Sequence, residues 1–397
     1  MKALHTILAA FASTLCITAA AQNGEYEFTV VKENPITSIK NQNRSGTCWC
    51  FSGLSFLESE AIRINKIKDK DAYPDFAEMF IVSHSYQTRA DKYVRLDGNL
   101  TFGPGSECED VLHIMKDYGL VPQSVMPGLN YGTELPVHGE LDAVLKAYVE
   151  AVNTLPNSTL STAWLRGFTG ILDAYFGECP VEFEYQGKSY TPRSYADSYN
   201  LNADDYVSLT SFTHHPFYTK FPIEIADNWR YDQAYNLPLD ELMDVLFGAI
   251  EKGYTTTWGG DVSEPGFTRN GIAVIPDTDA PASTSGSDQE RWVGKDNSQP
   301  EAKAENSVPR EKAISQEYRQ KGFDEKTTTD DHGMQAFGIA KDQNGTRYLM
   351  IKNSWGETGK YKGIWYISES FTRAKMIDFV VHKDALPKEL KAKLGIK

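Results

Sequence analysis

The chain has 397 residues, of which 41% are hydrophobic and 12% aromatic, and its formal net charge is −14. This composition supports a packed core and excludes a disordered or fibrous chain. The length fits one large domain or two to three smaller ones, and the acidic charge disfavours nucleic acid as a partner.

The N-terminal segment has the pattern of a secretory signal peptide. Lys2 supplies a positive charge, residues 3–17 are mostly apolar, and Ala19–Ala21 has the small-residue form of a cleavage site. We expect cleavage after Ala21, which makes residues 22–397 a secreted or periplasmic protein. The apolar stretch is short for a membrane span, and no later segment reaches the roughly 18 apolar residues of one. We therefore expect no stable membrane insertion once the signal is removed.

The first half of the mature chain is predicted to be largely helical after a short β-rich stretch at 27–40. From residue 48 onward, Phe51, Leu54, Leu57 and Ala61 recur at intervals of three and four residues, and this pattern predicts an amphipathic helix over 48–65. Similar patterns and helix-stopping glycines predict further helices at about 77–92, 108–118, 141–155, 162–176 and 239–252.

The middle of the chain is mixed, and one polar stretch interrupts it. Strand-like pieces occur at 181–185 and 254–258. Residues 277–310 are rich in Ser, Pro, Asp, Gly and Ala, and they contain few large apolar residues. This stretch is predicted to be a long exposed loop, either a simple surface insertion or a lid.

The last part is predicted to be dominated by β-strands, at 335–341, 347–353, 363–368 and 376–382. Asn344-Gly345 lies between the first two of these strands, and this dipeptide between two apolar runs is a strong β-hairpin signal. Helices are thus predicted mainly in the first half and strands mainly in the last part.

The cysteines and histidines do not indicate a disulfide scaffold or a metal site. Four of the five cysteines remain after signal removal, and Cys108 and Cys179 could pair, although nothing in the sequence decides this. No CxxC spacing occurs. His214-His215 is the only adjacent histidine pair, and Pro216 beside it indicates a loop. We therefore expect no bound metal.

Cys48 has the surroundings of a nucleophile. It opens the first predicted helix, where unpaired backbone N–H groups and the helix dipole favour a thiolate. A histidine beside it in the fold would favour the thiolate further. The alternative is that Cys48 is a small buried apolar residue. Cys50 is turned about 200° away from Cys48 on a helix, so we expect it in the core.

Four other residues can complete a site for acyl transfer. Gln42 can donate its side-chain N–H to an oxyanion, together with the backbone N–H of Cys48. His332, just before a predicted strand, can act as the base. Asn353, at the end of the next strand of the hairpin, can accept the ring N–H of that base. Trp355 can shield this hydrogen bond from water.

These motifs resemble those of the papain-like cysteine peptidases. The matching features are Gln42, the Cys48-Trp49 pair followed by Phe51-Ser52, the later histidine, and the run Asn353–Gly356. From Cys48 to His332 the chain advances 332 − 48 = 284 residues, where that family has roughly 130–150. With this long insertion, the chain resembles the bleomycin hydrolase and aminopeptidase C branch. Further segments that support this branch are 116–122, 255–261 and 379–381.

The resemblance implies catalytic roles and a fold. Cys48 would be the nucleophile, His332 the base, Asn353 the residue that orients the base, and Gln42 the oxyanion donor. The implied fold is α+β and papain-like, with a large insertion, and it has two lobes with the cleft between them. Its parts are a helical lobe at about 41–176, an inserted region at about 177–276, the exposed loop at 277–310 and a β-barrel-like lobe at about 328–385.

The resemblance also implies what the protein binds. Gly105 and Ser106 fall where the family binds the substrate backbone, and Trp355 belongs to the same substrate-binding set. The implied substrates are peptides, no cofactor is implied, and the implied assembly is a homo-oligomer, a hexamer.

Two departures from this branch bear on the expected activity. Its members are typically cytosolic, whereas this chain carries an export signal. They also carry a C-terminal arm that anchors the substrate amino terminus, whereas here the chain stops at Lys397. We expect an aminopeptidase, with a papain-like endopeptidase as the main alternative and a cysteine amidase or an inactive binding protein as minor ones. Asp261, Asp330 and Asp331 are candidates for holding the substrate α-ammonium instead of the arm.

Overall fold

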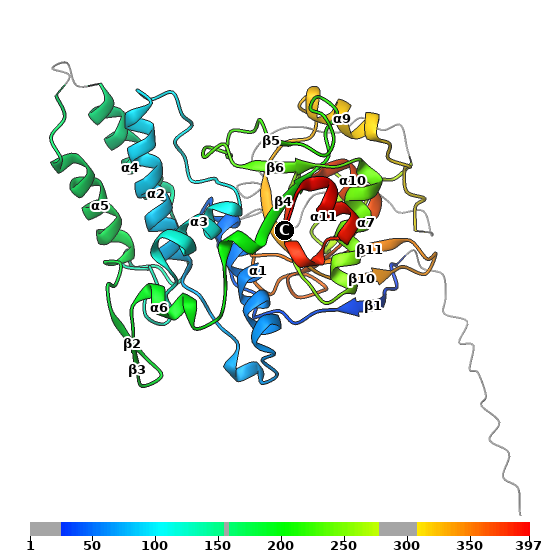
Figure 1. Ribbon diagram of the computed structural model, residues 1–397, viewed down its shortest axis with the longest axis horizontal. Coiled ribbons are helices and arrows are strands. Elements are labelled where there is room, and N and C mark those ends of the chain that lie inside the picture. Colours follow the sequence, from blue (N-terminus) through cyan, green and yellow to red (C-terminus); the bar gives the residue numbers. More distant parts are fainter. Residues whose placement is uncertain (1–24, 155–158, 278–307) are drawn as a thin grey trace, which may run out of the picture.

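The computed structural model describes residues 25–154, 159–277 and 308–397. In these ranges an array of helices packs beside one large β-sheet, and the helix α1 lies between the two parts (Figure 1). This is the α+β arrangement expected from the sequence. The predicted signal peptide at 1–21 and most of the predicted loop at 277–310 lie outside the described residues. No helix within the described ranges is long and apolar enough to cross a membrane.

The helical part contains the amphipathic helices predicted from the sequence. α1 spans Cys48–Asn65, as predicted, and ends where Lys66 adopts a left-handed conformation with φ 53°. Most of α1 is buried because it packs on helices on one side and on strands on the other. The short α6 was not predicted; it begins at a capping box formed by Thr191 and Ser194. The bounds are α2 (Glu78–Arg95), α3 (Glu109–Tyr118), α4 (Gly139–Asn153), α5 (Ala163–Phe176) and α6 (Pro192–Asp197), with the 3₁₀ helix η1 (Lys70–Ala72).

Within the described ranges, the β-rich part is a single sheet of eleven strands in the order β5-β6-β4-β13-β7-β10-β11-β12-β9-β8, with β1 paired to β10. A separate small hairpin joins β2 (Phe183–Tyr185) to β3 (Lys188–Tyr190). The strands of the sheet are β1 (Thr29–Glu33), β4 (Tyr206–Thr210), β5 (Lys220–Pro222), β6 (Gln233–Asn236), β7 (Thr256–Gly260), β8 (Phe267–Thr268), β9 (Ile272–Ala273), β10 (His332–Lys341), β11 (Arg347–Lys352), β12 (Ile364–Ser368) and β13 (Met376–His382).

The sheet of the predicted barrel-like lobe does not close into a barrel within the described residues. Its two end strands, β5 and β8, do not pair with each other among the described residues. β4, β5 and β6 come from the middle of the chain and extend the sheet beyond β13. β5 then ends the sheet after three residues, and its Pro222 has no backbone N–H to offer a further strand.

Four helices accompany the sheet in the described part of the chain, so the C-terminal region is less purely β than predicted. α7 was predicted and packs against β10, where Leu246, Trp258 and Met334 belong to one buried apolar cluster. The other three were not predicted; α10 fills the short connection between β12 and β13. The bounds are α7 (Leu239–Glu251), α9 (Gln316–Asp324), α10 (Glu369–Lys375) and α11 (Lys388–Leu394), with the 3₁₀ helices η2 (Ala203–Asp205) and η3 (Lys383–Ala385).

The hairpin that positions the candidate site is the one predicted at Asn344-Gly345. β10 and β11 pair antiparallel, and Gln335 lies opposite Lys352. In the turn, Asp342 accepts the backbone N–H of Thr346 at 2.8 Å, and the glycine has a φ of +83°, which favours glycine. This register brings the start of β10 beside the residue that follows β11.

Candidate active site

His332 and Asn353 meet through a buried hydrogen bond. His332 is the first residue of β10 and Asn353 follows β11, so the hairpin brings their side chains together. Nε2 of His332 lies 2.8 Å from Oδ1 of Asn353, and the two residues are only 2% and 1% exposed. The same Oδ1 accepts the backbone N–H of Ser354 at 2.7 Å, which identifies it as the amide oxygen. Nε2 therefore carries the ring hydrogen, and Nδ1 is the atom that can accept a proton.

Trp355 covers this histidine. The ring centroids of Trp355 and His332 are 4.7 Å apart, with the ring planes tilted by 31°. Burial lowers the pKa of His332 to about 4, although the hydrogen bond to Asn353 and the charge of Asp331 oppose this shift. A charged imidazolium here therefore needs an anion beside it, and a cysteine thiolate is such an anion.

Cys48 opens α1 and is half-buried, whereas the next two residues are buried. The turn before it lies close to a second loop: a Cβ atom on Gly46 would lie 2.7 Å from Cγ of Pro104, too close for a side chain without movement. Trp49 fixes the same loop, because its Nε1 donates to the carbonyl of Pro104 at 3.0 Å. The thiol thus lies at the first turn of α1, where a helix N-terminus favours an anion.

The remaining cysteines of the described residues have other environments. Cys50 is fully buried, as predicted, and burial raises its pKa well above the usual value. Burial also raises the pKa of Cys108. Cys108 and Cys179 both carry free thiols, so the pairing that the sequence left open does not form.

The start of β10 packs on the first turn of α1. A Cβ atom on Gly333 would lie 2.8 Å from Oγ of Ser52 and 3.4 Å from Cα of Trp49, so glycine permits this close approach. His332 precedes Gly333 in the chain, and Cys48 precedes Trp49. The structure therefore brings the predicted nucleophile and the predicted base to one contact between helix and sheet.

Gln42 is held in a fixed orientation by Ser354, which sequence reasoning did not single out. Ser354 donates its hydroxyl to Oε1 of Gln42 and accepts the backbone N–H of Gln42 at 2.8 Å. The side-chain Nε2 of Gln42 donates one hydrogen to the carbonyl of Ser45 at 2.8 Å. An amide nitrogen has two hydrogens, so Gln42 has a second N–H for an oxyanion. Two adjacent residues thus orient the site: Asn353 orients the base His332, and Ser354 orients the amide donor Gln42.

The loop with Gly105 and Ser106 lies beside the cysteine turn, through the Pro104 contacts described above. Arg89 holds this loop by donating to the carbonyls of Gly103 and Gly105. The hydroxyl of Ser106 donates to Asp110 and accepts Nε1–H of Trp229. The side chain of Ser106 is therefore engaged inside the protein, and substrate binding by Gly105 and Ser106 stays a prediction.

The acidic residues near His332 are largely engaged by the protein itself. Asp261 accepts the backbone N–H groups of Ser263 at 2.8 Å and Thr329 at 3.2 Å, and it lies 3.5 Å from Nζ of Lys375. Burial raises the pKa of Asp261 to about 8. Asp331 accepts the hydroxyl of Thr329 at 2.9 Å. These contacts disfavour Asp261 and Asp331 as receptors for a substrate α-ammonium.

A buried group of charges that sequence reasoning missed joins the two parts of the fold. Nζ of Lys40 lies 2.6 Å from a carboxylate oxygen of Glu78 and 3.6 Å from one of Glu58. Lys352 lies in the same group, since the charges of Glu58 and Glu78 raise its pKa against the stronger effect of burial. Lys352 directly precedes Asn353 in the chain. We call Lys40, Lys352, Glu58 and Glu78 the lysine-neutralised cluster.

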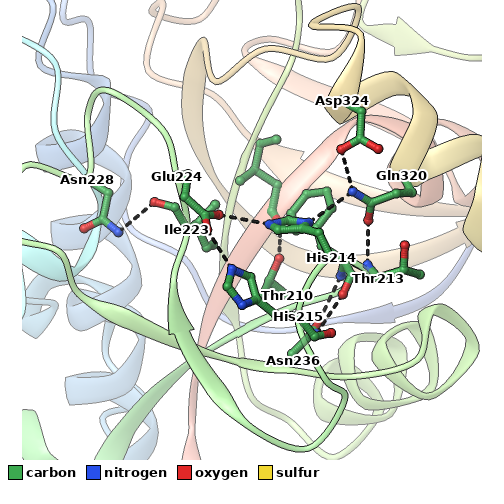
Figure 2. A network of polar contacts seen from close by, with 12 residues as sticks. Thr210, Thr213, His214, His215, Ile223, Glu224, Asn228, Asn236, Gln320 and Asp324 are labelled. Carbon is green, nitrogen blue, oxygen red and sulfur yellow. Dashed lines mark hydrogen bonds and ion pairs between the residues drawn. The ribbon is translucent and has the colours of Figure 1, made fainter.

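The histidine pair of the sequence forms a hydrogen-bonded network on the protein surface. Figure 2 shows Glu224 between the rings of His214 and His215, whose Nε2 atoms lie 3.0 and 2.6 Å from its carboxylate oxygens. Gln320 accepts the backbone N–H of Thr213 and donates to Nδ1 of His214 at 3.0 Å. Nε2 of His214 thus carries the hydrogen in the neutral ring, and it points at Glu224 as a donor. This protonation favours hydrogen bonding over metal coordination.

The chain is similar to known peptidases in sequence and in fold. A family model described as the peptidase C1-like family matches residues 312–396. Aminopeptidase G of Lactobacillus delbrueckii subsp. lactis is 24% identical, over 90% of this chain and 83% of its own length. Aminopeptidase C of Lactobacillus helveticus is 22% identical, over 94% of this chain and 88% of its own length. The crystal structure of PepW from Lactobacillus rhamnosis HN001 has a TM-score of 0.66 at 19% identity, over 92% of this chain and 84% of that chain.

The fold is that of the papain-like cysteine peptidases, with helices on the cysteine side and strands on the histidine side. Residues 312–396 match the peptidase C1-like family, and the chain is similar over most of its length to relatives named aminopeptidases. It is a cysteine-type peptidase, as its sequence resemblance implied.

Proposed function

We propose that the protein is a secreted cysteine aminopeptidase of the bleomycin hydrolase type, which uses Cys48, His332, Asn353 and Gln42. The hydrogen bond between His332 and Asn353 carries this proposal, because it fixes the ring and leaves Nδ1 as the proton acceptor. The relatives named aminopeptidases C and G, which this chain matches over most of its length, support removal of amino-terminal residues.

The first half of the reaction forms an acyl-enzyme. Nδ1 of His332 takes the proton of the Cys48 thiol, and the sulfur attacks the carbonyl carbon of the peptide bond. The oxygen of that carbonyl becomes an anion, which the second N–H of Gln42 and the backbone N–H of Cys48 stabilise. The imidazolium then gives its proton to the leaving amine as the C–N bond breaks, which leaves the acyl group on sulfur.

The second half restores the thiol. His332 takes a proton from water as the water oxygen attacks the thioester carbon, and the C–S bond breaks. The sulfur leaves as a thiolate, which recovers the proton from the imidazolium. Because burial disfavours an isolated imidazolium, the charged ring forms only while the thiolate or the oxyanion is beside it.

Turnover of fluorogenic aminoacyl amides tests this proposal. The substrates are one amide with a free amino terminus and its N-acetylated counterpart, assayed under reducing conditions. We expect cleavage of the free substrate only, lost by about a thousandfold or more in Cys48→Ala. Cys50→Ala is the matched control, because it removes a buried thiol two residues away, and it should keep the activity of the folded protein.

Each contrary result identifies one alternative. Cleavage of the acetylated substrate at an equal rate would mean an endopeptidase. Labelling of Cys48 without any peptide turnover would favour a cysteine amidase. Equal turnover by Cys48→Ala would exclude the proposed nucleophile altogether.

A further inference from the structure

The loop that joins β5 to β6 is held by hydrogen bonds where it leaves the sheet. We call this loop, residues 223–232, the strap. The carboxylate of Glu224 lies 3.0 and 2.6 Å from the Nε2 atoms of His214 and His215 (Figure 2). Within the loop, the side-chain amide of Asn228 donates to two backbone carbonyls, at 3.1 and 3.0 Å. The strap therefore has a fixed path at this end.

The other end of the strap is docked on the helical part. Trp229 is 2% exposed, and its Nε1 donates to Oγ of Ser106 at 2.7 Å and to Oδ2 of Asp110 at 2.9 Å. Nζ of Lys92 on α2 donates to the carbonyls of Trp229 at 2.9 Å and Arg230 at 3.2 Å. The strap thus runs from the sheet to the helices, and both parts hold the residues in its middle.

Asp227, in the middle of the strap, lies on the loop beside the cysteine turn. A Cβ atom on Gly105 would lie 2.7 Å from Cγ of Asp227, so glycine leaves the room that this carboxylate occupies. Gly105 follows Pro104, and the ring of Pro104 packs on Gly46, two residues before Cys48. The carboxylate of Asp227 is therefore separated from the cysteine turn by one loop.

The carboxylate of Asp227 also lies within electrostatic reach of the segment that carries the base. Burial raises the pKa of Asp227, and the charge of Arg89 opposes this shift. The charges of Asp110 and Asp331 raise the pKa further, and Asp331 directly precedes His332. Asp227 is thus close both to the loop beside the nucleophile and to the start of β10.

The oxygens of this carboxylate are not engaged by other described residues. Burial and charges, but no hydrogen bond, act on the pKa of Asp227. Arg89 uses its guanidinium for backbone carbonyls instead, at 2.9 Å to Thr101 and 3.0 Å to Gly103, and also to Gly105. Arg89 thus favours the ionised form of Asp227 and leaves its oxygens available to a ligand.

We propose that Asp227 receives the α-ammonium group of the substrate. This assignment rests on the proposed function, and it names the residue that would select a free amino terminus. An α-ammonium has a full charge and three N–H donors, so a carboxylate with available acceptor sites matches it. The α-nitrogen lies only about 2.5 Å from the carbonyl carbon that the thiol attacks, so its receptor must lie close to the nucleophile, as Asp227 does.

Asp227 suits this role better than two acidic residues considered from the sequence. Asp261 accepts the backbone N–H groups of Ser263 and Thr329, and Asp331 accepts the hydroxyl of Thr329. Either residue would lose these bonds on turning to a ligand, whereas Asp227 would only gain bonds. An acetyl group on the amino terminus removes the charge that Asp227 would bind and adds bulk beside the strap.

The test compares three amides that differ only at the amino group: the free amine, the N-acetyl compound, and the desamino compound, in which hydrogen replaces the amino group. Wild type should cleave the free amine with at least a tenfold higher kcat/KM than the desamino amide. In Asp227→Asn this ratio should fall about tenfold. Asp232→Asn is the matched control: it makes the same substitution in the same strap, removes the partner of His113 and should leave the ratio as in wild type.

Alkylation of Cys48 by iodoacetamide separates substrate selection from damage to the site. Asp227→Asn should be alkylated at the wild-type rate, because the thiol and its base are unchanged. A slower rate, together with equal losses on the free and desamino amides, would mean that Asp227 supports the structure of the site and does not bind the ammonium.

Two further results would overturn the proposal. An unchanged ratio in folded Asp227→Asn would mean that another group binds the α-ammonium. Equal cleavage of all three amides by wild type would keep Cys48 as the nucleophile and exclude any receptor for the amino terminus.

Failure of the proposed function remains distinguishable from failure of this inference. If wild type cleaves none of the amides, the catalytic proposal fails by itself. Calorimetric titration of Cys48→Ala with trialanine and with its desamino counterpart then tests Asp227 without turnover. Roughly tenfold tighter binding of trialanine, lost on adding Asp227→Asn, supports the inference, and equal binding of the two peptides contradicts it.

Discussion

The protein holds two groups of carboxylates, and they differ in their counter-charge. One is the lysine-neutralised cluster; the other, which we call the acidic cluster, consists of Glu107, Glu109 and Asp378, whose carboxylate oxygens lie within 4.8 Å of one another. In the lysine-neutralised cluster, burial lowers the pKa of Lys40, but the charges of Glu78, Glu58 and Asp75 raise it more, so the ammonium stays charged. In the acidic cluster, the neighbouring charges that act most strongly on Glu107 are carboxylates. The first arrangement joins the two parts of the fold, whereas in the second, burial and the neighbouring carboxylates raise the pKa values of Glu107 and Glu109 well above the usual range.

The largest loss of stability is expected from removing the counter-charge of the lysine-neutralised cluster. Lys40→Met leaves Glu58 and Glu78 buried without their closest cation, and we expect a loss of about 3–5 kcal/mol in the free energy of unfolding. Urea denaturation at neutral pH measures this loss. The matched control is Lys116→Met, which removes a lysine from an exposed pair with Asp204 and should cost less than about 0.5 kcal/mol. Similar losses for both variants would contradict the comparison.

Removing a charge from the acidic cluster should instead increase the free energy of unfolding at neutral pH. Burial raises the pKa of Asp378 from 3.8 to about 6, so the folded protein binds this proton more tightly than the unfolded chain does. The stability from this group is present below pH 3.8 and is lost as the pH rises to about 6. Asp378→Asn should therefore stabilise the protein at pH 7, by about 1–3 kcal/mol. Urea denaturation at pH 4 and pH 7 should show the gain only at pH 7, and a loss at pH 7 would contradict this account.

A smaller change in stability is expected from replacing Lys352. For this lysine the effect of burial on the pKa outweighs that of the neighbouring carboxylates, whereas for Lys40 the carboxylates outweigh burial. Its Nζ donates to the hydroxyl of Thr37 at 2.9 Å, and burial lowers its pKa from 10.5 to about 8. The unfolded chain then binds more protons than the folded protein between pH 8 and 10.5, so this group makes stability rise with pH there. Lys352→Met removes a buried charge that the fold disfavours, but also part of the counter-charge of Glu58 and Glu78. The free energy of unfolding at pH 7 should therefore change by less than about 1 kcal/mol, and the rise should be abolished. A cost equal to that of Lys40→Met would show that the two lysines contribute alike.

Local sequence signals predicted the elements that hold the proposed catalytic residues. The apolar spacing after Cys48 defined α1, and Asn344-Gly345 defined the hairpin of β10 and β11. Both signals are short in range, because a helix repeats every 3.6 residues and a tight turn needs only two. The pairing of His332 with Asn353 followed from that hairpin.

Long-range pairing could not be predicted in the same way. The open sheet depends on β4 pairing with β13, which lies far away in the chain, and on strands of two to five residues with little periodicity. The acidic cluster is likewise assembled by the fold, since Glu107 and Asp378 are 378 − 107 = 271 residues apart. Ser354 stood inside a recognised motif, but its hydroxyl bond to Gln42 appears only in the folded protein.

The measurement that most directly tests the central claim is the rate of cysteine alkylation by iodoacetamide, mapped to each thiol by peptide mass spectrometry. We compare wild type with His332→Ala at pH 6 to 9, with the buried Cys50 and Cys108 as internal references. The account predicts rapid alkylation of Cys48 alone at pH values below 8.5, the usual thiol pKa, and a rate reduced by about a hundredfold in His332→Ala. Equal alkylation of Cys48 in both proteins would contradict the pairing of nucleophile and base.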